Sequence, residues 1–543
     1  MNRIRFTLVA LLGIFLLSIV VIWSVGPGGV RQVSHPTLTR GLTSDPESLD
    51  PHKARSVQAS EVLRDIGEGL LSYSPGGELV PGVAESWQKS DDGLTYTFTL
   101  RDDARWTNGD PVTADQFVFS LRRLETPATG AFYADLLGNI ENAREILAGR
   151  KPPADLGVAA PDPHTLVIRL SQPTPYLLSL LALPSTFPVH PPTLQKFGDA
   201  FTRPGNLVSN GAYKLDAWQP GSTLKLSRNP YYWNDAATSI EEVQYLVLTE
   251  ENTQLNRFRA GELDVTDTVP PKNIDDLKKE FGDQLHIAPY LGVYFYGFNL
   301  TKPPFKDNPE LRQALSMAID RDAIVASVTR RGELPAYSWV PPGVEHYEPR
   351  RFTYAGRTQD ERNGIARRLY QEAGYGPDNP LRIELRYPMN DTEKLIAVAV
   401  QQMWHEVLGV ETDLIGEEFK TLLADIRARE VTQVFRSSWI GDYNDAHTFL
   451  GVMESNNPAN QPGYESAQFD SLMKQAAAQA DPDHREYFLE EAEREMLADH
   501  PVIPIYFYVS KHLVASRVRG WQDNVLDYHY SQQLSLAPNA AQN

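Results

Sequence analysis

The stretch from Leu94 to Phe119 reads LTYTFTLRDDARWTNGDPVTADQFVF and carries the clearest structural signals in the chain. Its first part, Leu94–Leu100, alternates apolar and polar residues, which is typical of a strand with one buried face. From Asp110 onward the spacing becomes helical, with Pro111 near the first turn and Thr113 as a candidate N-cap. A strand followed closely by a helix predicts a fold of mixed α and β structure.

The same two patterns recur outward from this stretch in both directions. They predict strands at Thr165–Leu170, Val243–Leu248, Val431–Phe435 and Val502–Val509, and helices opening at Pro309 and covering Glu393–Leu408, Glu417–Glu430 and Arg485–Leu497. On the helix before Gly409 the expected buried face carries Leu395, Ile396, Ala399, Met403 and Val407. Gly76-Gly77 predicts a hairpin turn. Because strands occur near both ends of the chain, we expect the C-terminus to return and complete a discontinuous lobe.

Composition narrows the function classes. The chain has 543 residues, enough for three to four domains, and 41% hydrophobic and 22% charged residues are ordinary globular values. Seventy acidic against 51 basic residues give a net charge of −19, which argues against a nucleic-acid-binding surface. The absence of cysteine excludes disulfides, thiolate metal sites, cysteine nucleophiles and lipid attachment through cysteine.

The N-terminus carries a membrane signal. Arg3 and Arg5 precede an uncharged apolar run from Thr7 to Val25, about the length that crosses a ~30 Å hydrocarbon core. Two interpretations stay open for residues 1–26, a cleaved signal peptide or an uncleaved inner-membrane anchor formed by residues 7–25. Residues 27–39 are expected to form a linker. Either way the basic end stays cytoplasmic and the rest of the chain is exported.

Catalytic motifs are scarce. The sequence has no nucleophile elbow, phosphate-binding loop or dinucleotide fingerprint. His405-Glu406 lacks the second histidine of a zinc-protease motif, and the twelve histidines show no ligand-like spacing. We therefore expect a binding protein without a dedicated metal site or cofactor rather than an enzyme.

The segment Val434–Asn444 (VFRSSWIGDYN) is the strongest binding candidate. An expected strand carries Arg436, and a glycine-containing turn presents Asp442 six residues later. The two Cα atoms lie at most about 20 Å apart, so the segment could offer an anion and a cation to the two ends of a short peptide. An ordinary surface ion pair explains the same spacing.

A set of motifs resembles one known family. They are Ser48–His52 (SLDPH), Gly67–Leu71, Pro81–Trp87, Trp106–Phe119, Asn210–Tyr213, Asn256–Asp264, Leu311–Leu315, Met317–Arg321 and Ala373–Tyr375. Together they resemble the bacterial extracellular solute-binding proteins of the peptide/nickel class (family 5), and within it the oligopeptide- and murein-tripeptide-binding receptors of ABC importers. The matches run from about residue 40 to about 530.

The resemblance implies a mixed α/β, type-II-like periplasmic binding protein with two lobes and a hinge. Lobe I would comprise residues 40–67, 192–292 and 510–543, with an inserted domain at 68–191, and lobe II would comprise 293–509. Such a protein captures short peptides between closing lobes and presents them to inner-membrane permease subunits with cytoplasmic ATPases. We expect a monomer that binds no nucleic acid.

The resemblance also implies site residues. Asp442, in the stretch Trp439–Asn444, matches the aspartate that holds the peptide ammonium. Arg436 and Arg427 match basic residues that meet the peptide C-terminus, and Trp439 and Phe419 match aromatic pocket residues. Tyr133 matches a cleft tyrosine from the inserted domain, and Tyr443 is the tyrosine beside the aspartate.

Several positions depart from the family pattern. Glu393 stands where oligopeptide binders have a histidine, Thr329 where they have a lysine, and Arg55 replaces a glutamate. The anion-accepting side is therefore altered, which leaves the preferred peptide length open. The alternatives are a tethered envelope sensor or scaffold, an exported hydrolase, or binding of murein peptide, nickel or haem.

Overall fold

The computed structural model describes residues 37–270, 274–479 and 481–537. The predicted signal or anchor, residues 1–26, lies outside the described residues. Within those three ranges, no helix has the length and apolar character required to cross a membrane.

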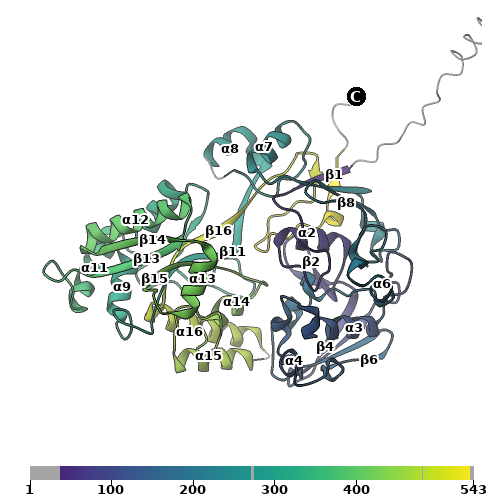
Figure 1. Cartoon of the computed structure of the whole chain (residues 1–543), viewed down its shortest axis with the longest axis horizontal. Helices are drawn as coiled ribbons and strands as arrows, with labels where there is room; N and C mark the ends of the chain where they lie inside the picture. The colour runs from purple at the N-terminus through teal and green to yellow at the C-terminus, as the bar shows by residue number, and fades with distance from the viewer. Residues whose placement is uncertain (1–36, 271–273, 480, 538–543) are drawn as a thin grey trace, which may run out of the picture. The chain divides into compact units, whose positions relative to one another are not determined.

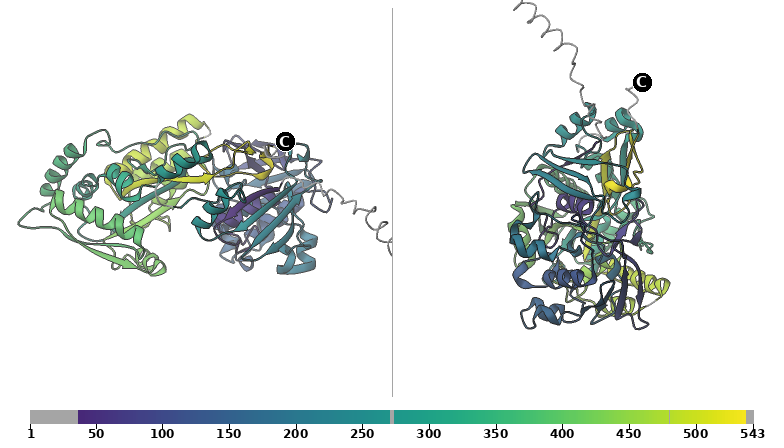
Figure 2. Two further views of the ribbon diagram at one scale, coloured as in Figure 1. Left: turned by 90° about the horizontal axis from the view of Figure 1, so that it is seen from above. Right: turned by 90° about the vertical axis from the view of Figure 1, so that its right-hand side faces the viewer.

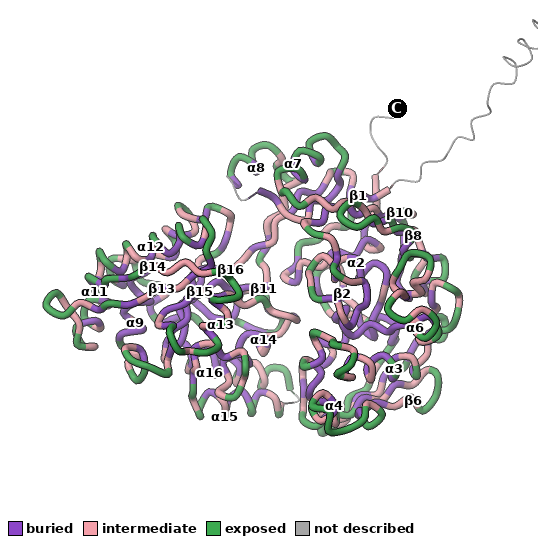
Figure 3. Tube along the Cα trace, viewed as in Figure 1, coloured by how far each residue is buried: buried purple, intermediate pink, exposed green. Residues whose placement is uncertain are grey.

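The largest sheet has six strands and mixed pairing, in the order β12-β16-β11-β15-β13-β14. Its strands are β12 (Leu334–Pro335), β16 (Val502–Leu513), β11 (Leu285–Phe298), β15 (Val434–Ile440), β13 (Arg382–Pro388) and β14 (Glu411–Glu417). β13 runs parallel to β14 and β15, whereas the other pairs are antiparallel. The central strands β11 and β16 are largely buried, whereas the edge strands β12 and β14 are mostly half-buried or exposed. Figure 3 shows exposed outer turns on the helices around the sheet.

Helices surround the six-stranded sheet (Figure 1). α12 and α13 pack against β13, and α11 packs against α9 and α12, while α14, α15 and α16 form a second group. Their bounds are α9 (Pro309–Met317), α10 (Arg321–Ala323), α11 (Gln359–Glu372), α12 (Asp391–Leu408), α13 (Phe419–Ala428), α14 (His447–Leu450), α15 (Ala467–Ala477) and α16 (Pro482–Asp499).

Two four-stranded sheets make up much of the rest. The first sheet has the order β1-β10-β9-β8, with β1 (Thr37–Leu42), β10 (Glu242–Val247), β9 (Thr223–Arg228) and β8 (Tyr213–Gln219). The second sheet has the order β4-β5-β7-β6, with β4 (Ala84–Lys89), β5 (Thr95–Leu100), β7 (Thr165–Arg169) and β6 (Val158–Asp162). The helices here are α2 (Val57–Ile66), α3 (Ala114–Leu124), α4 (Ala143–Leu147), α5 (Leu177–Leu180), α6 (Pro191–Phe197), α7 (Glu251–Arg259) and α8 (Ile274–Phe281).

The core beside the first sheet draws on distant parts of the chain. Residues from Leu38 to Ile66, from Ala212 to Val265 and from Val514 to Leu534 share one hydrophobic cluster. The C-terminal segment, with β17 (Val518–Arg519) and β18 (Ser535–Leu536), therefore returns to the N-terminal strands, as the chain order suggested. The predicted domain boundaries themselves stay a prediction.

The long strands β11 and β16 connect the six-stranded sheet with the region of the first sheet (Figure 2). Residues 285–289 of β11 pair with 509–513 of β16, and pairing resumes at Val293 only after a register shift. Tyr290, Leu291 and Gly292 lie in this gap, and Leu291 N–H instead donates to the Val525 carbonyl, at 3.0 Å. A bulge of this kind bends a strand and re-aims its side chains.

The predicted elements agree with the structure except in detail. Thr113 is the N-cap of α3 and forms a capping box with Gln116, although the helix begins at Ala114, after the predicted start. The hairpin at Gly76-Gly77 joins β2 (Leu71–Tyr73) to β3 (Leu79–Pro81), with Gly77 at a φ of +89°.

The predicted buried face of α12 is only partly correct. Ile396 is buried, and Met403 and Val407 are half-buried and pack against the core, but Leu395 is exposed. The fully buried apolar residues are Ile396, Ala397, Val400, Trp404 and Leu408. The helix has apolar residues on more than one side, so periodicity alone placed the centre of the buried face incorrectly.

Candidate functional site

Asp442 lies in the turn that follows β15, at the junction of two cavities. The first cavity has a volume of about 140 Å³ and the second about 970 Å³, and Asp442 lines both. Its backbone N–H donates to Thr448 Oγ1 at 3.2 Å, which holds the turn.

No described side chain neutralises the Asp442 carboxylate. No ion pair or hydrogen bond is recorded for its oxygens within the described ranges, and burial raises its pKa to about 6. A half-buried carboxylate without a partner is costly. The arrangement is therefore suited to a cationic ligand group that enters the cavity.

Three tyrosines and two arginines, Arg55 and Arg64, line the first cavity. Tyr133 comes from the second-sheet region, Tyr290 from the gap in β11 and Tyr528 from the C-terminal segment. Arg64, on α2, stacks its guanidinium over the ring of Tyr528 at 4.0 Å. Of these residues, Tyr133 was predicted; Arg64 and Tyr528 were not, because no local motif marks them.

The second cavity is aromatic on the side of Asp442. Trp439 and Tyr443 line it, as do Tyr176 and His447. The Tyr176 ring stacks on Tyr443 at 5.1 Å and on His447 at 4.2 Å. Trp439 Nε1 is buried and has no hydrogen-bond partner within the described part of the chain.

Arg436 and Phe419 line a third cavity of about 540 Å³. Phe419 is the first residue of α13 and is 53% exposed. Arg436 is not free: its Nη2 lies 2.8 Å from Oε1 of Glu393, and its guanidinium lies 4.5 Å from the ring centroid of Tyr294. Glu393, which stands where oligopeptide binders have a histidine, thus neutralises Arg436, the arginine expected to receive a peptide carboxylate.

Arg427 lies apart from these cavities. It is exposed in the last turn of α13 and lines none of the three cavities. Asp442, Tyr133, Trp439 and Tyr443 are thus brought together around two joined cavities, and Arg436 and Phe419 around the third.

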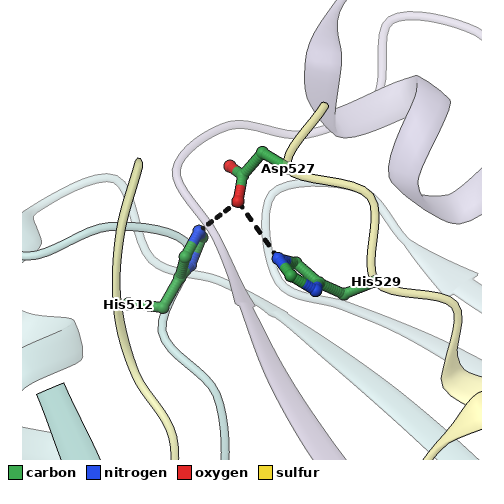
Figure 4. Close-up of side chains that lie close together, drawn as sticks. All are labelled: His512, Asp527 and His529. Carbon is green, nitrogen blue, oxygen red and sulfur yellow. Dashed lines mark hydrogen bonds and ion pairs between the residues drawn. The ribbon is translucent and has the colours of Figure 1, made fainter. Parts of the chain in front are cut away.

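The structure also gathers one group that the histidine spacing did not reveal. His512, Asp527 and His529 meet beside the first cavity, with their ligand-type atoms within 4.8 Å of one another (Figure 4). The histidine spacing along the chain gave no sign of this cluster, because spacing cannot detect residues that only the fold brings together.

Comparisons with known proteins agree with one family. The family model described as "Bacterial extracellular solute-binding proteins, family 5 Middle" matches residues 78–461. The chain is 41% identical over 514 residues to the periplasmic oligopeptide-binding protein OppA of Escherichia coli (strain K12), with 94% of each chain covered.

Solved structures are similar as well. The unliganded open form of the periplasmic murein tripeptide binding protein MppA matches with a TM-score of 0.84 and 36% identity, over 93% of this chain and 98% of that chain. Haemophilus influenzae OppA in complex with the peptide RPPGFSPFR matches with a TM-score of 0.75 and 36% identity, over 93% of this chain and 99% of that chain. The expected α/β, type-II-like binding-protein fold is thereby confirmed, and the chain belongs to the bacterial extracellular solute-binding proteins, family 5.

Proposed function

We propose that this protein is the substrate-binding receptor of a peptide ABC importer. It captures short peptides between two lobes, lobe I with its inserted domain and lobe II, and presents them to inner-membrane permease subunits. The relatives named for oligopeptide and murein tripeptide binding support this assignment. It is a binding protein of the periplasm, and residues 7–25 direct its export or anchor it to the inner membrane.

The observation that carries the proposal is the unpaired carboxylate of Asp442. A peptide ammonium is the natural partner, because burying either charge alone costs several kcal/mol. Since both cavities meet at Asp442, the ammonium would be enclosed as the ligand binds. No covalent step is involved.

The bound peptide would extend from Asp442 along β15. Arg436, Ser438 and Ile440 alternate onto one face of this strand, and Ile440 lines the first cavity while Arg436 lines the third. The distance from Arg436 to Asp442 is at most about 20 Å, which suits a peptide of a few residues. Tyr133, Trp439, Tyr443 and Phe419 would border the side-chain pockets, with ordered water filling unused space.

Arg427 has a smaller role in this proposal. As the structure places it outside the three cavities, we assign it to longer peptides that emerge beyond Phe419. The C-terminal carboxylate of a short peptide would instead approach Arg436, whose charge Glu393 already neutralises.

Calorimetric titration of peptide-free protein with trialanine, and with its N-acetylated form, tests the proposal. The free peptide should bind and the acetylated one should bind far more weakly. Asp442→Asn should weaken binding of the free peptide by about 2–5 kcal/mol, because the ammonium loses its buried partner. Asp413→Asn, at an exposed position of β14, is the matched control and should bind like wild type. Equal affinities for the free and acetylated peptides would show that Asp442 is not the anchor.

A further inference from the structure

Two histidines and an aspartate that the peptide-binding proposal does not use converge beside the first cavity (Figure 4). His512 is near the end of β16, and Asp527 and His529 belong to the segment between β17 and β18. Nε2 of His512 lies 2.8 Å, and Nε2 of His529 lies 3.1 Å, from the same Asp527 oxygen, Oδ1. One carboxylate oxygen thus faces two ring nitrogens.

The other ring nitrogen of His512 fixes its orientation. Nδ1 lies 2.8 Å from the backbone carbonyl oxygen of Thr266. A carbonyl only accepts, so Nδ1 carries the hydrogen and Nε2 is the atom directed at Asp527. Histidines that bind metals are commonly oriented by this same hydrogen bond to a carbonyl.

The remaining two side chains are also held in place. The ring of His529 stacks on Trp521 with a centroid distance of 3.6 Å and an interplanar angle of 19°. The turn that carries Asp527 is held by Asn524, whose Oδ1 accepts from the N–H groups of Leu526 and Tyr528, both at 3.2 Å. Rigid support of this kind is what a binding site requires.

We propose that His512, Asp527 and His529 form a binding site for a divalent transition-metal ion, with zinc as the preferred ion. Two imidazole nitrogens and a carboxylate oxygen are ligands that suit Zn²⁺, Co²⁺ and Ni²⁺. In tetrahedral zinc sites the ligand atoms lie about 3.3 Å apart, as follows from bond lengths near 2.0–2.2 Å. The two contacts to Asp527, at 2.8 and 3.1 Å, need to lengthen only slightly, and the ligand-type atoms of all three residues lie within 4.8 Å of one another.

The position of the cluster leaves room for further ligands. Asp527 lines the first cavity, whereas the side chains of His512 and His529 are only 6% and 5% exposed. Water, or a group of a molecule bound in the cavity, can therefore complete the coordination from one side. Three protein ligands with an open position are typical of zinc sites that are accessible to solvent or substrate.

The surroundings accept added positive charge. Two cations lie nearby: Arg64, which lines the same cavity as Asp527, and Arg40, whose Nη1 donates to the His529 backbone carbonyl at 2.7 Å. The charge of Arg40 is opposed by three carboxyl groups: Glu61, Asp65 and Asp267. Without a metal ion, a proton on Nε2 of His512 satisfies the contact with Asp527. Binding of M²⁺ replaces this proton, which is released to solvent.

Titration of peptide-free, metal-stripped and untagged full-length protein with Co²⁺ tests the site. We expect one equivalent to produce the visible absorption of a low-symmetry cobalt site with nitrogen and oxygen ligands, and Zn²⁺ to abolish it by displacement. His529→Gln should lower the affinity by about a hundredfold. The matched control is His484→Gln on α16, an exposed histidine 3.9 Å from Asp481, which should leave the titration unchanged.

A thermal-unfolding series separates loss of metal binding from loss of folding. Zn²⁺ should raise the melting temperature of wild type and of His484→Gln by mass action, but not that of His529→Gln. Circular dichroism of the metal-free variants confirms that they are folded. No cobalt absorption in wild type, or equal affinities in wild type and His529→Gln, would overturn the proposal. The three residues would then be a hydrogen-bonded His512–Asp527 pair with His529 beside it.

Discussion

Arg436 Nη2 donates to Oε1 of Glu393 across 2.8 Å, and both side chains are nearly buried, at 12% and 9% exposure. The other carboxylate oxygen of Glu393 accepts from the hydroxyl of Tyr294. Because Arg436 also donates to Tyr508 Oη, at 3.2 Å, the ion pair ties α12 to β15 and to both connecting strands. The cation proposed to receive the peptide carboxylate is thus already paired with Glu393 in the unliganded protein.

Replacing Glu393 should therefore cost stability. In Glu393→Gln the charge is lost while the shape is kept, and we expect the free energy of unfolding to fall by about 1.5–3 kcal/mol, the usual contribution of a hydrogen bond to a charged group. Glu411→Gln is the control, since the Arg382–Glu411 pair has side chains that are 78% and 48% exposed. An exposed pair contributes at most about 1 kcal/mol. Urea unfolding of the two variants measures the difference, and equal losses would contradict the prediction.

Peptide binding should weaken in acid. Burial raises the pKa of Asp442 to about 6, so its carboxylate is mainly ionised at pH 7 and mainly protonated at pH 5 when no ligand is bound. The ammonium requires the ionised form, so the affinity for a free-amino peptide should fall about tenfold from pH 7 to pH 5. Calorimetry at several pH values tests this. A wild-type peptide affinity that does not change with pH would contradict the prediction. Asp442→Asn should not show the tenfold fall in affinity between pH 7 and pH 5.

For the unliganded protein the same pKa shift acts in the opposite direction. Because the folded state holds the Asp442 proton more tightly than the unfolded chain, this group stabilises the fold as the pH falls from about 7 toward 4. Wild type should therefore gain stability relative to Asp442→Asn over this range. Parallel pH-dependent melting curves of the two proteins would count against the raised pKa.

Local sequence signals predicted the helices and strands well, but they did not predict the contacts between segments that are distant in the sequence. Thr113 marked the start of α3 because a capping residue acts on its own helix. Glu393 was noted as unusual, but its pairing with Arg436 depends on where α12 packs across the sheet. His512 and His529 are brought together only when the C-terminal segment folds back beside β16. The sequence thus indicated Asp442 as a candidate, whereas its position between two cavities could be described only from the fold.

Gly292 should be sensitive to a single added methyl group. A Cβ at this position would lie 2.5 Å from Cδ1 of Ile440 and 2.9 Å from Cδ2 of Tyr508, inside the gap where β11 and β16 lose register. Gly292→Ala should destabilise the protein by about 1–3 kcal/mol and weaken peptide binding, since Ile440 lines the first cavity.

The control for this variant is Gly364→Ala, in the middle of α11. No atom lies within 4 Å of an added Cβ there, so alanine should stabilise the helix by about 0.5–1 kcal/mol and leave peptide affinity unchanged. Thermal melts together with titrations of both variants check the pair. Unaltered stability and affinity in Gly292→Ala would show that the crossing of β11 and β16 is more adaptable than its packing implies.

The ion pair between Arg436 and Glu393 also predicts how the charge of the peptide C-terminus affects binding affinity. In wild type Arg436 is paired with Glu393, so a short peptide and its C-terminal amide should bind with similar affinity. Glu393→Gln frees the guanidinium, and the peptide with a free carboxylate should then bind about tenfold more tightly than the amide, as one added charge-assisted hydrogen bond predicts. Calorimetric titration with tri- and tetraalanine and their amides measures the ratio of acid to amide affinity in both proteins. The peptide length at which the preference is largest identifies the chain length that reaches Arg436.

Two outcomes would contradict this account of Arg436. A strong preference for the free carboxylate in wild type would mean that the ligand displaces Glu393, and no preference in Glu393→Gln would mean that the carboxylate is held elsewhere.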